Sequence, residues 1–192
     1  SKICFIDMHK IYEDIFDRVP LSLLKYSWFL ENISTQPRIT YDALKRIMDI
    51  VVSLPLVIIS LIFYPFVWLA IKLNDGGPVF ISQERVGKFG RTIHILKFRS
   101  MEVNDLNLGS DTHAENKVTS VGKFLRSTRI DELPQLWGVL RGNLSLIGPR
   151  PELPRGVAHY TEEIPYYNIR HLIKPGLSGW AQIYHDAHPH HG

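Results

Sequence analysis

Two adjacent carboxylates, Asp131 and Glu132, are the residues with the clearest chemical potential. Pro134 suits a first helical turn, and apolar residues follow it at helical spacing until Gly142, a typical helix stop. The pattern therefore places both carboxylates at a helix N-terminus, where free N–H groups and the helix dipole favour carboxylate and phosphate alike. Taken alone, Asp131 would be interpreted as a helix cap, because aspartate is a preferred N-cap residue.

Cations surround this acidic pair in the sequence. Arg126 and Arg129 precede it, Arg150 follows it, and Lys97 and Arg99 stand in an earlier string. Arginine forks match phosphate oxygens, and lysine offers a point charge. Any one of these cations would be interpreted as a solvated surface side chain. Together with the carboxylates they predict a phosphate-binding site.

Phosphoryl transfer is the chemistry that fits this set. A carboxylate can act as a nucleophile and form an acyl phosphate, and a neighbouring carboxylate can hold Mg²⁺ together with substrate phosphates. We expect Asp131 and Glu132 to be the catalytic pair and to provide the protein ligands of Mg²⁺. The metal and the arginines would neutralise charge on the transferring group.

A long apolar segment precedes this site. No charged residue occurs between Ile50 and Ile71. A helix of that length, at about 1.5 Å per residue, could cross a hydrocarbon core of about 30 Å. Helices of soluble domains rarely stay apolar on all sides for so long. We therefore interpret residues 41–73 as a membrane helix.

The residues alone leave open whether this helix spans the membrane or dips into it. Pro55 and Pro65 each remove a backbone hydrogen bond and favour a kink. Lys45 and Arg46 precede the run and further cations follow it, so both ends prefer the cytoplasmic side. A bent helix that returns to its starting side satisfies both features, and a Pro-kinked transmembrane helix is the alternative. Asp49, at the mouth of the run, is expected to mark the interface and to pair with Arg46.

Length and composition bound the remaining choices. The chain of 192 residues is long enough for one domain with an anchor and a linker. Its single cysteine excludes an internal disulfide. We expect residues 1–40 to form an amphipathic connector and the segment that follows residue 73 to open with a β-hairpin. The basic residues flank an apolar run and carboxylates rather than forming a stripe with stacking aromatics, so nucleic-acid binding is a poor hypothesis.

At this point the chain resembles a known family, the monotopic phosphoglycosyl transferases, also called bacterial sugar transferases or undecaprenyl-phosphate sugar phosphotransferases. The resemblance covers residues 41–183 and rests on strings that occur in order. They are Lys45-Arg46-Ile47-Met48-Asp49, Gly77-Pro78-Val79-Phe80, Gln83-Glu84-Arg85-Val86-Gly87, Lys97-Phe98-Arg99-Ser100-Met101, Asp131-Glu132-Leu133-Pro134-Gln135-Leu136, Gly148-Pro149-Arg150-Pro151-Glu152, Pro175-Gly176 and Gly179-Trp180-Ala181-Gln182.

The resemblance implies a reaction and a role for each matching residue. Asp131 matches the aspartate that attacks the β-phosphate of a nucleoside diphosphate sugar, which leaves a covalent phosphosugar and releases a nucleoside monophosphate. Polyprenyl phosphate then takes the sugar phosphate. Glu132 matches the residue that helps to hold Mg²⁺. The family's phosphate-binding cations fall on Lys97, Arg126 and Arg150.

The resemblance also implies a fold and a location. We expect a mostly helical α+β fold with one re-entrant membrane helix, interfacial helices, a small β-hairpin and a catalytic domain over residues 74–192 that is truncated at its C-terminal end. The expected location is the cytoplasmic face of a bacterial inner membrane. The expected partners are a nucleoside diphosphate sugar, polyprenyl phosphate and the membrane, and a homodimer stays open.

Three departures from the family pattern bear on these expectations. The Ser-Pro pair common at the helix break is Leu61-Ile62 here, which leaves the place of the bend open between these residues and the two prolines. The last string continues as Ile183-Tyr184-His185-Asp186, without the arginine that many relatives have. The histidine-rich end predicts a polar tail rather than a zinc site. The alternative function is a non-catalytic membrane scaffold for envelope polysaccharide assembly, which would have no use for the acidic pair.

Overall fold

The computed structural model describes residues 39–102, 118–179 and 182–183. Within them the chain is mostly helical and carries two small two-stranded sheets, so the predicted α+β class is confirmed. The expected connector, apart from its last two residues, and the histidine-rich end lie outside the described residues.

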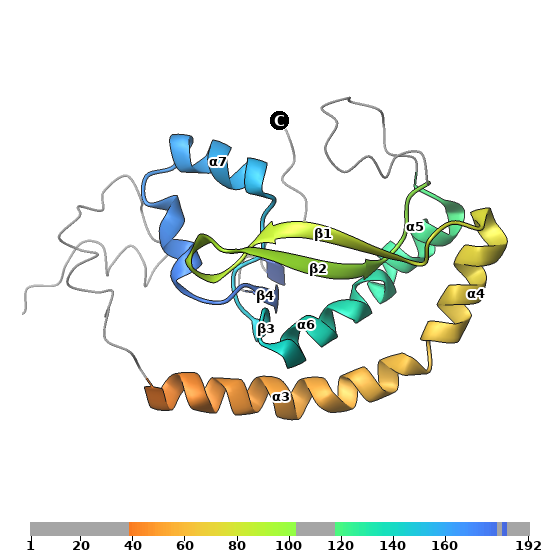
Figure 1. Cartoon of the computed structure of the whole chain (residues 1–192), viewed down its shortest axis with the longest axis horizontal. Helices are drawn as coiled ribbons and strands as arrows, with labels where there is room; N and C mark the ends of the chain where they lie inside the picture. The colour runs from red at the N-terminus through yellow and green to blue at the C-terminus, as the bar shows by residue number, and fades with distance from the viewer. Residues whose placement is uncertain (1–38, 103–117, 180–181, 184–192) are drawn as a thin grey trace, which may run out of the picture.

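Two helices joined by a bend form the lower edge and one side of the molecule (Figure 1). Helix α3 covers Ile39–Leu61 and helix α4 covers Tyr64–Asp75, and their axes differ by 50°. In the described part of the chain, neither helix alone has both the length and the apolar composition needed to cross a membrane. The bent pair taken together meets that length and composition.

The bend includes Ile62, the second position of the pair that matches the family's Ser-Pro, and it does not occur at Pro55. Pro55 lies inside the continuous helix α3, whereas the break falls at Ile62 and Phe63. The turn there is closed by backbone bonds from Ile62 to Ile59 (3.2 Å) and from Phe63 to Ser60 (3.0 Å). Pro65 stands in the first turn of α4, where a missing N–H has no helical partner to lose. The kink expected at Pro55 is therefore wrong, and Pro65 starts a helix.

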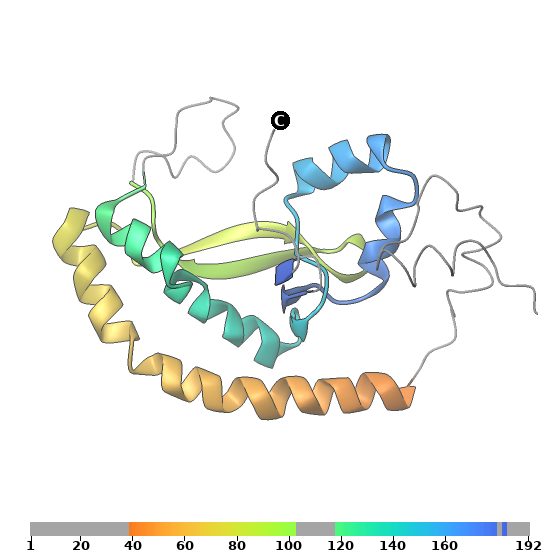
Figure 2. The ribbon, with the colours of Figure 1, turned by 180° about the vertical axis from the view of Figure 1, so that it is seen from behind.

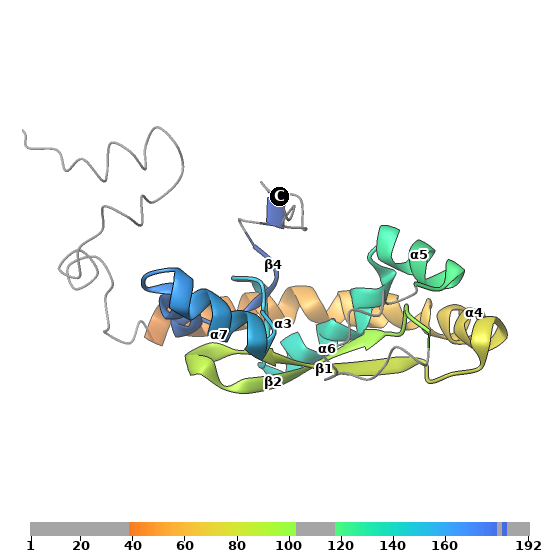
Figure 3. The ribbon, with the colours of Figure 1, turned by 90° about the horizontal axis from the view of Figure 1, so that it is seen from above.

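The β-hairpin is present, with strand β1 at Phe80–Val86 and strand β2 at Thr92–Phe98. The strands are antiparallel, and Phe80 is paired with Phe98 and Val86 with Thr92. A short 3₁₀ turn, η2 (Lys88–Gly90), closes the hairpin. Figures 1 and 3 show that the hairpin and α3 both run along the long axis of the molecule.

Three consecutive helical pieces fill the space between the hairpin and the bent helices. They are α5 (Ser120–Ser127), the 3₁₀ helix η4 (Ile130–Gln135) and α6 (Leu136–Arg141). Figures 1 and 2 show α6 between α3 and the hairpin. Gly142 ends α6 in the left-handed conformation (φ 88°), as its place in the sequence predicts.

The C-terminal part of the described chain returns to this centre. Strand β3 (Ser145–Ile147) pairs in parallel with strand β4 (Gly176–Ser178), a sheet that the sequence did not indicate. Between them come α7 (Pro154–Glu163) and the 3₁₀ helix η5 (Tyr167–Leu172).

Two apolar clusters hold these elements together. One joins α4 to the hairpin and α5 through Val67, Ile71, Phe98 and Leu125. The other joins β2, α6 and the segment before β3 through buried side chains at Ile95, Val139 and Leu144. Because α4 contributes to the first cluster, the helix that follows the bend is packed back onto the body of the domain.

Helix α3 exposes most of its aliphatic side chains, which is the reverse of the pattern in a helix of a soluble domain. The side chains that it buries are Asp49, Ser53, Val57 and Ser60, which are small or polar. Its aliphatic side chains and those at the bend are largely exposed, including Val51, Leu54, Ile58, Leu61 and Ile62. A contiguous apolar surface of this kind is typical of a membrane or protein contact rather than of water.

Candidate active site

The acidic pair lies in the 3₁₀ helix η4 rather than at the start of an α-helix. Arg129, which precedes η4, adopts a left-handed conformation (φ 58°), and α6 begins only after Pro134. Proline has no N–H to donate and fits poorly beyond the first helical turn, which explains why the predicted single helix is divided. Asp131 and Glu132 therefore stand in the first turn of η4, above the hairpin strand β2.

Asp131 is the more enclosed of the two carboxylates. Its residue is 7% exposed, whereas the side chain of Glu132 is 24% exposed. The Oδ1 atom of Asp131 is buried and has no hydrogen-bond partner in the described structure. A capping aspartate would accept a bond from a backbone N–H with such an atom, so this oxygen does not have the capping role that its position alone would allow. Buried polar atoms without partners are rare and are expected at functional sites.

The charge of Asp131 is set by opposing influences. Burial is the main cause that raises the pKa of the Asp131 carboxyl, and the negative charge of Glu132 raises it further. The positive charges of Lys97, Arg126 and Arg129 act against this rise. A carboxylate that is poorly solvated and still faced by cations is a suitable nucleophile for an anionic phosphate.

Glu132 connects the pair to the cations. Its Oε1 accepts a hydrogen bond from Nζ of Lys97 at 3.2 Å, and Nη1 of Arg129 lies 3.7 Å from the same oxygen. Arg126 donates from Nε to Oγ of Ser100 at 2.9 Å, and its charge acts on Asp131. Three of the five predicted phosphate-binding cations, Lys97, Arg126 and Arg129, thus surround the acidic pair.

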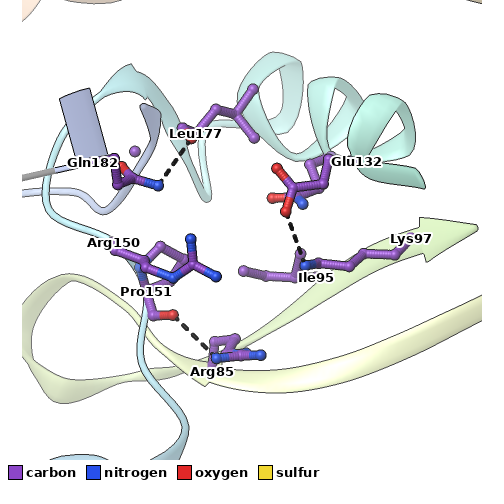
Figure 4. A pocket seen from close by; sticks show the side chains of 10 residues that line it. Arg85, Ile95, Lys97, Glu132, Arg150, Pro151, Leu177 and Gln182 are labelled. Atoms are coloured by element: carbon purple, nitrogen blue, oxygen red, sulfur yellow. Dashed lines mark hydrogen bonds and ion pairs between the residues drawn. The ribbon is translucent and has the colours of Figure 1, made fainter. Parts of the chain in front are cut away.

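A polar pocket opens beside Glu132 on the side of the hairpin (Figure 4). Arg150 reaches this pocket from the segment after β3, and Lys97 reaches it from β2. The remaining polar lining includes Arg85, Gln135 and Gln182, which sequence reasoning did not select. The pocket has the cationic character that a diphosphate requires.

Arg99 does not join this group. Its residue is 2% exposed, and its guanidinium forms a bidentate ion pair with the carboxylate of Asp75 at the end of α4. Its Nε also donates to the carbonyl oxygen of Pro78 at 2.6 Å. The structure therefore gives Arg99 the role of fastening α4 to the hairpin, in place of the predicted contact with phosphate.

Lys45, Arg46 and Asp49 fasten α3 to the same body. Nη1 and Nη2 of Arg46 donate to the carbonyl oxygens of Val139 and Leu140, each at 2.6 Å, at the C-terminal end of α6. Nζ of Lys45 donates to Oγ of Ser145 at 2.6 Å.

Asp49 faces β3 rather than a membrane interface. It is 3% exposed, and its Oδ1 accepts bonds from Oγ of Ser145 and the N–H of Leu146, both at 3.1 Å. Its nearest cation is Lys45 at 3.9 Å. The pairing of Asp49 with Arg46 is therefore wrong, because Arg46 is occupied by the end of α6.

An apolar hollow of about 280 Å³ lies on the other side of Glu132. It runs between the end of α3 and the segment formed by η4 and α6, and it is open to the outside. Its walls are Leu56, Ile59, Ser60, Phe63, Leu133, Leu136 and Leu177, with Arg129 and Glu132 as the charged members. Glu132 and Leu177 line both this hollow and the polar pocket, so the two spaces meet at Glu132.

The residues present fit a magnesium ion in a limited sense. Among the residues that the structure describes, no group of three or more histidine, cysteine, aspartate or glutamate side chains could hold a metal ion without help. Magnesium usually binds through one or two carboxylates plus substrate phosphates and water. The unpartnered Oδ1 of Asp131 beside the carboxylate of Glu132 matches that kind of donor set.

Comparison with known proteins agrees with this arrangement. Residues 40–190 match the family described as bacterial sugar transferase, and the chain belongs to this family. Over 160 residues it is 45% identical to a UDP-N-acetylgalactosamine-undecaprenyl-phosphate N-acetylgalactosaminephosphotransferase of Aeromonas hydrophila. Over 142 residues it is 43% identical to a UDP-glucose:undecaprenyl-phosphate glucose-1-phosphate transferase of Escherichia coli K12.

The chain matches only part of these relatives. The two alignments cover 79% and 73% of this chain but 36% and 31% of the relatives. A shorter relative, a UDP-glucose:undecaprenyl-phosphate glucose-1-phosphate transferase of Caulobacter vibrioides, is 39% identical over 152 residues, which are 77% of this chain and 56% of that protein. The matched region includes the site described above.

Proposed function

We propose that this chain transfers a sugar 1-phosphate from a nucleoside diphosphate sugar, expected to be a UDP-hexose, to undecaprenyl phosphate. The observation that carries the proposal is the position of Glu132, which lines both a cationic pocket and an apolar hollow and is next in sequence to the buried Asp131. Such a junction suits an enzyme that joins a water-soluble anion to a lipid. The names of the three relatives described above, which all include undecaprenyl phosphate, support the same reaction.

In the first half of the proposed reaction, the sugar nucleotide occupies the cationic pocket and Asp131 attacks its β-phosphorus. A bond forms between a carboxylate oxygen of Asp131 and phosphorus. The bond from phosphorus to the oxygen bridging to the α-phosphate breaks, and its electron pair leaves with the nucleoside monophosphate. Lys97, Arg126 and Arg129, whose charges act on Asp131, offset the charge on the transferring group.

In the second half, the acceptor lipid occupies the apolar hollow. A phosphate oxygen of undecaprenyl phosphate attacks the phosphosugar, the bond to Asp131 breaks, and the carboxylate is regenerated. Arg129 stands at the edge of this hollow, where it can hold the lipid phosphate, and Leu56, Ile59 and Phe63 contact the first isoprene units. The hollow opens from a helix whose exposed surface is apolar, so a lipid can enter from the bilayer.

Magnesium belongs to the proposal as a bound cofactor. Asp131 and Glu132 would hold it together with the phosphates of the donor. When bound, it would supply Lewis-acid stabilisation of charge on the phosphate oxygens. The protein's own contribution is to hold Asp131 in a buried turn next to Glu132 and to place the charges of Lys97, Arg126 and Arg129 around it.

A re-entrant membrane helix is the arrangement of α3 and α4 that these attachments favour. The start of α3 is bonded to α6 through Arg46, and α4 is packed on the hairpin through Val67 and Ile71. Both ends of the bent pair are thus attached to one body. A straight crossing would separate them by about 30 Å of hydrocarbon. We propose that the apolar middle enters the cytoplasmic leaflet of a bacterial inner membrane and returns.

The reaction is tested with the purified chain in nanodiscs, Mg²⁺, undecaprenyl phosphate and a panel of UDP-sugars. Release of nucleoside monophosphate measures turnover, and mass spectrometry of the denatured protein detects a phosphosugar on Asp131. Asp131→Asn is expected to abolish both signals while expression is unchanged. Glu84→Gln, which removes an exposed carboxylate of β1, serves as the matched control and retains both signals.

A membrane scaffold would behave differently in the same assay. It would release no nucleoside monophosphate from any donor of the panel, and Asp131→Asn would change nothing. Full activity of Asp131→Asn would equally defeat the proposal, because the amide of asparagine cannot replace the carboxylate as the nucleophile.

A further inference from the structure

Arg85 is a cation of the polar pocket that neither its string nor its position in the sequence distinguished. It lies on β1, with its side chain on the face of the strand that is half-buried, and it lines the pocket together with Arg150. Figure 4 shows its guanidinium at the base of the pocket, below that of Arg150 and across from Glu132. The guanidinium is held in place by bonds from Nη1 to the carbonyl oxygen of Pro151 (3.3 Å) and from Nη2 to Oε1 of Gln83 (3.1 Å).

The surroundings of Arg85 are unfavourable to a lone cation. Burial lowers the pKa of its guanidinium, and the positive charge of Arg150 lowers it further, while Glu152 and Glu132 act in the opposite direction. Two guanidinium groups that repel each other in a half-buried pocket are stabilised when an anion binds between them. The bonds to Pro151 and Gln83 are with neutral groups and do not remove that repulsion.

The cations of the site fall into two groups around Glu132. Lys97, Arg126 and Arg129 are the cations whose charges act on Asp131. Arg85 interacts instead with Arg150 and with two glutamates. Figure 4 shows Arg85 and Arg150 across the pocket from Glu132, so the pocket presents two guanidinium groups to an anion on the side away from the acidic pair.

The geometry of phosphoryl transfer gives these two guanidinium groups a meaning. The attacking and leaving oxygens lie roughly in line on opposite sides of the reacting phosphorus. With the reacting phosphate at Asp131, the leaving oxygen and the α-phosphate lie further into a cavity. The apolar hollow cannot take them, because its walls are aliphatic apart from Arg129, Glu132 and Ser60. The polar pocket instead carries the side chains of Arg85, Lys97 and Arg150, which are suitable partners for phosphate oxygens.

We propose that Arg85 binds the α-phosphate of the donor and, together with Arg150, stabilises the charge that develops on the departing nucleoside monophosphate. This inference rests on the proposed function and adds to it the side of the reacting phosphate on which the nucleoside monophosphate leaves. When the phosphorus–oxygen bond breaks, its electron pair stays on the oxygen of the α-phosphate, and the guanidinium of Arg85 stabilises the negative charge on that oxygen. The second half of the reaction, in which the lipid attacks the aspartyl phosphosugar, involves no α-phosphate and does not need Arg85.

Half-reactions measured separately in nanodiscs test this assignment. In the first, wild type, Arg85→Gln and Arg85→Lys are mixed with UDP-sugar and Mg²⁺ without lipid, and the rate of nucleoside monophosphate release and adduct formation is recorded. In the second, the adduct is first accumulated on each protein and freed of nucleotide, and its loss is then followed after undecaprenyl phosphate is added. Arg91→Gln, which removes an exposed cation near the hairpin tip, is the matched control.

Arg85→Gln is expected to slow the first half-reaction by about a hundredfold, the loss typical of one missing donor to a developing anion. The second half-reaction stays at the wild-type rate, which also shows that the variant is folded. Arg85→Lys, which keeps the charge, recovers most of the lost rate, and Arg91→Gln matches wild type in both halves.

Two outcomes would overturn the role of Arg85. Equal slowing of both halves would mean that Arg85 only supports the fold of the site. An unchanged first half would mean that it does not meet the donor. Absence of adduct and of nucleoside monophosphate release in the wild-type protein is a distinct result, because it refutes the proposed function itself.

Discussion

Arg46 provides a quantitative test of how the membrane helix is joined to the catalytic segment. Arg46→Met keeps the apolar length of the side chain and removes both donors to the carbonyl oxygens of Val139 and Leu140. A hydrogen bond to a charged group contributes about 1.5–3 kcal/mol. The side chain is half-buried, so we take about half of the sum of two such bonds and expect a loss of about 1.5–3 kcal/mol.

The loss is measured by thermal unfolding in nanodiscs and by turnover. For a chain of this size, about 1 kcal/mol corresponds to about 2–4 °C, so the unfolding temperature is expected to fall by about 3–12 °C. Turnover is expected to fall as well, because α6 continues directly from the helix that carries Asp131. Arg46→Lys can donate to one carbonyl oxygen at a time and should recover about half of the stability.

Lys72→Met is the matched control, because Lys72 is an exposed cation at the far end of the bent pair, where its Nζ donates to the carbonyl oxygen of Gly76 at 3.1 Å. The reasoning is refuted if Arg46→Met is no less stable than Lys72→Met. It is also refuted if Arg46→Lys restores the protein completely, since the charge alone would then be sufficient and the two-pronged contact with α6 would be irrelevant.

Three further predictions follow from single contacts. Because the folded state raises the pKa of Asp131, it binds a proton more readily than the unfolded chain, and stability falls as the pH rises from about 3.8 towards the folded pKa. Asp131→Asn should therefore raise the unfolding temperature at neutral pH, and the gain should vanish in unfolding scans near pH 3. Asp75→Asn leaves the buried guanidinium of Arg99 without its carboxylate and should cost about 3 kcal/mol in denaturant unfolding, whereas Asp42→Asn should cost nothing measurable. Gly122→Ala should lower the unfolding temperature, although alanine favours helices, because the new Cβ would lie 2.0 Å from the backbone carbonyl oxygen of Ser100. A higher unfolding temperature would show that the backbone at this contact can shift.

Local rules of sequence were sufficient for the features that depend on neighbouring residues. Two short apolar runs, at residues 79–81 and 92–96, and the glycine turn between them predicted the hairpin, and Gly142 predicted the end of α6. The same rules failed where a single residue changes the type of helix. Pro134 divides the predicted helix into a 3₁₀ piece and an α piece, and this division is what brings Asp131 into a buried turn.

The apolar run shows a different limit of sequence reasoning. Its composition predicted a membrane helix, but it could not predict which face the helix buries. In the structure the buried face carries Asp49, Ser53, Val57 and Ser60, spaced by three or four positions. That spacing is visible in the sequence once a polar stripe is sought inside an apolar helix. The place of the bend could not be predicted from the prolines, because Pro55 is accommodated within α3 and the break falls about two turns later.

Arg99 and Arg85 show why a cation near a catalytic motif is a weak indicator of its role. Arg99 shares a string with Lys97, but β2 ends at Phe98, and the ion pair with Asp75 across the fold decides where its side chain lies. No local pattern contains that partner. Arg85 could have been found, because residues 81, 83 and 85 of β1 alternate with exposed neighbours and therefore share the inner face of the hairpin. The alternation of inner and outer positions along a strand is thus the better guide to which cations can reach a substrate. On β1 it places Arg85 on the inner face and its neighbour Glu84 on the exposed face.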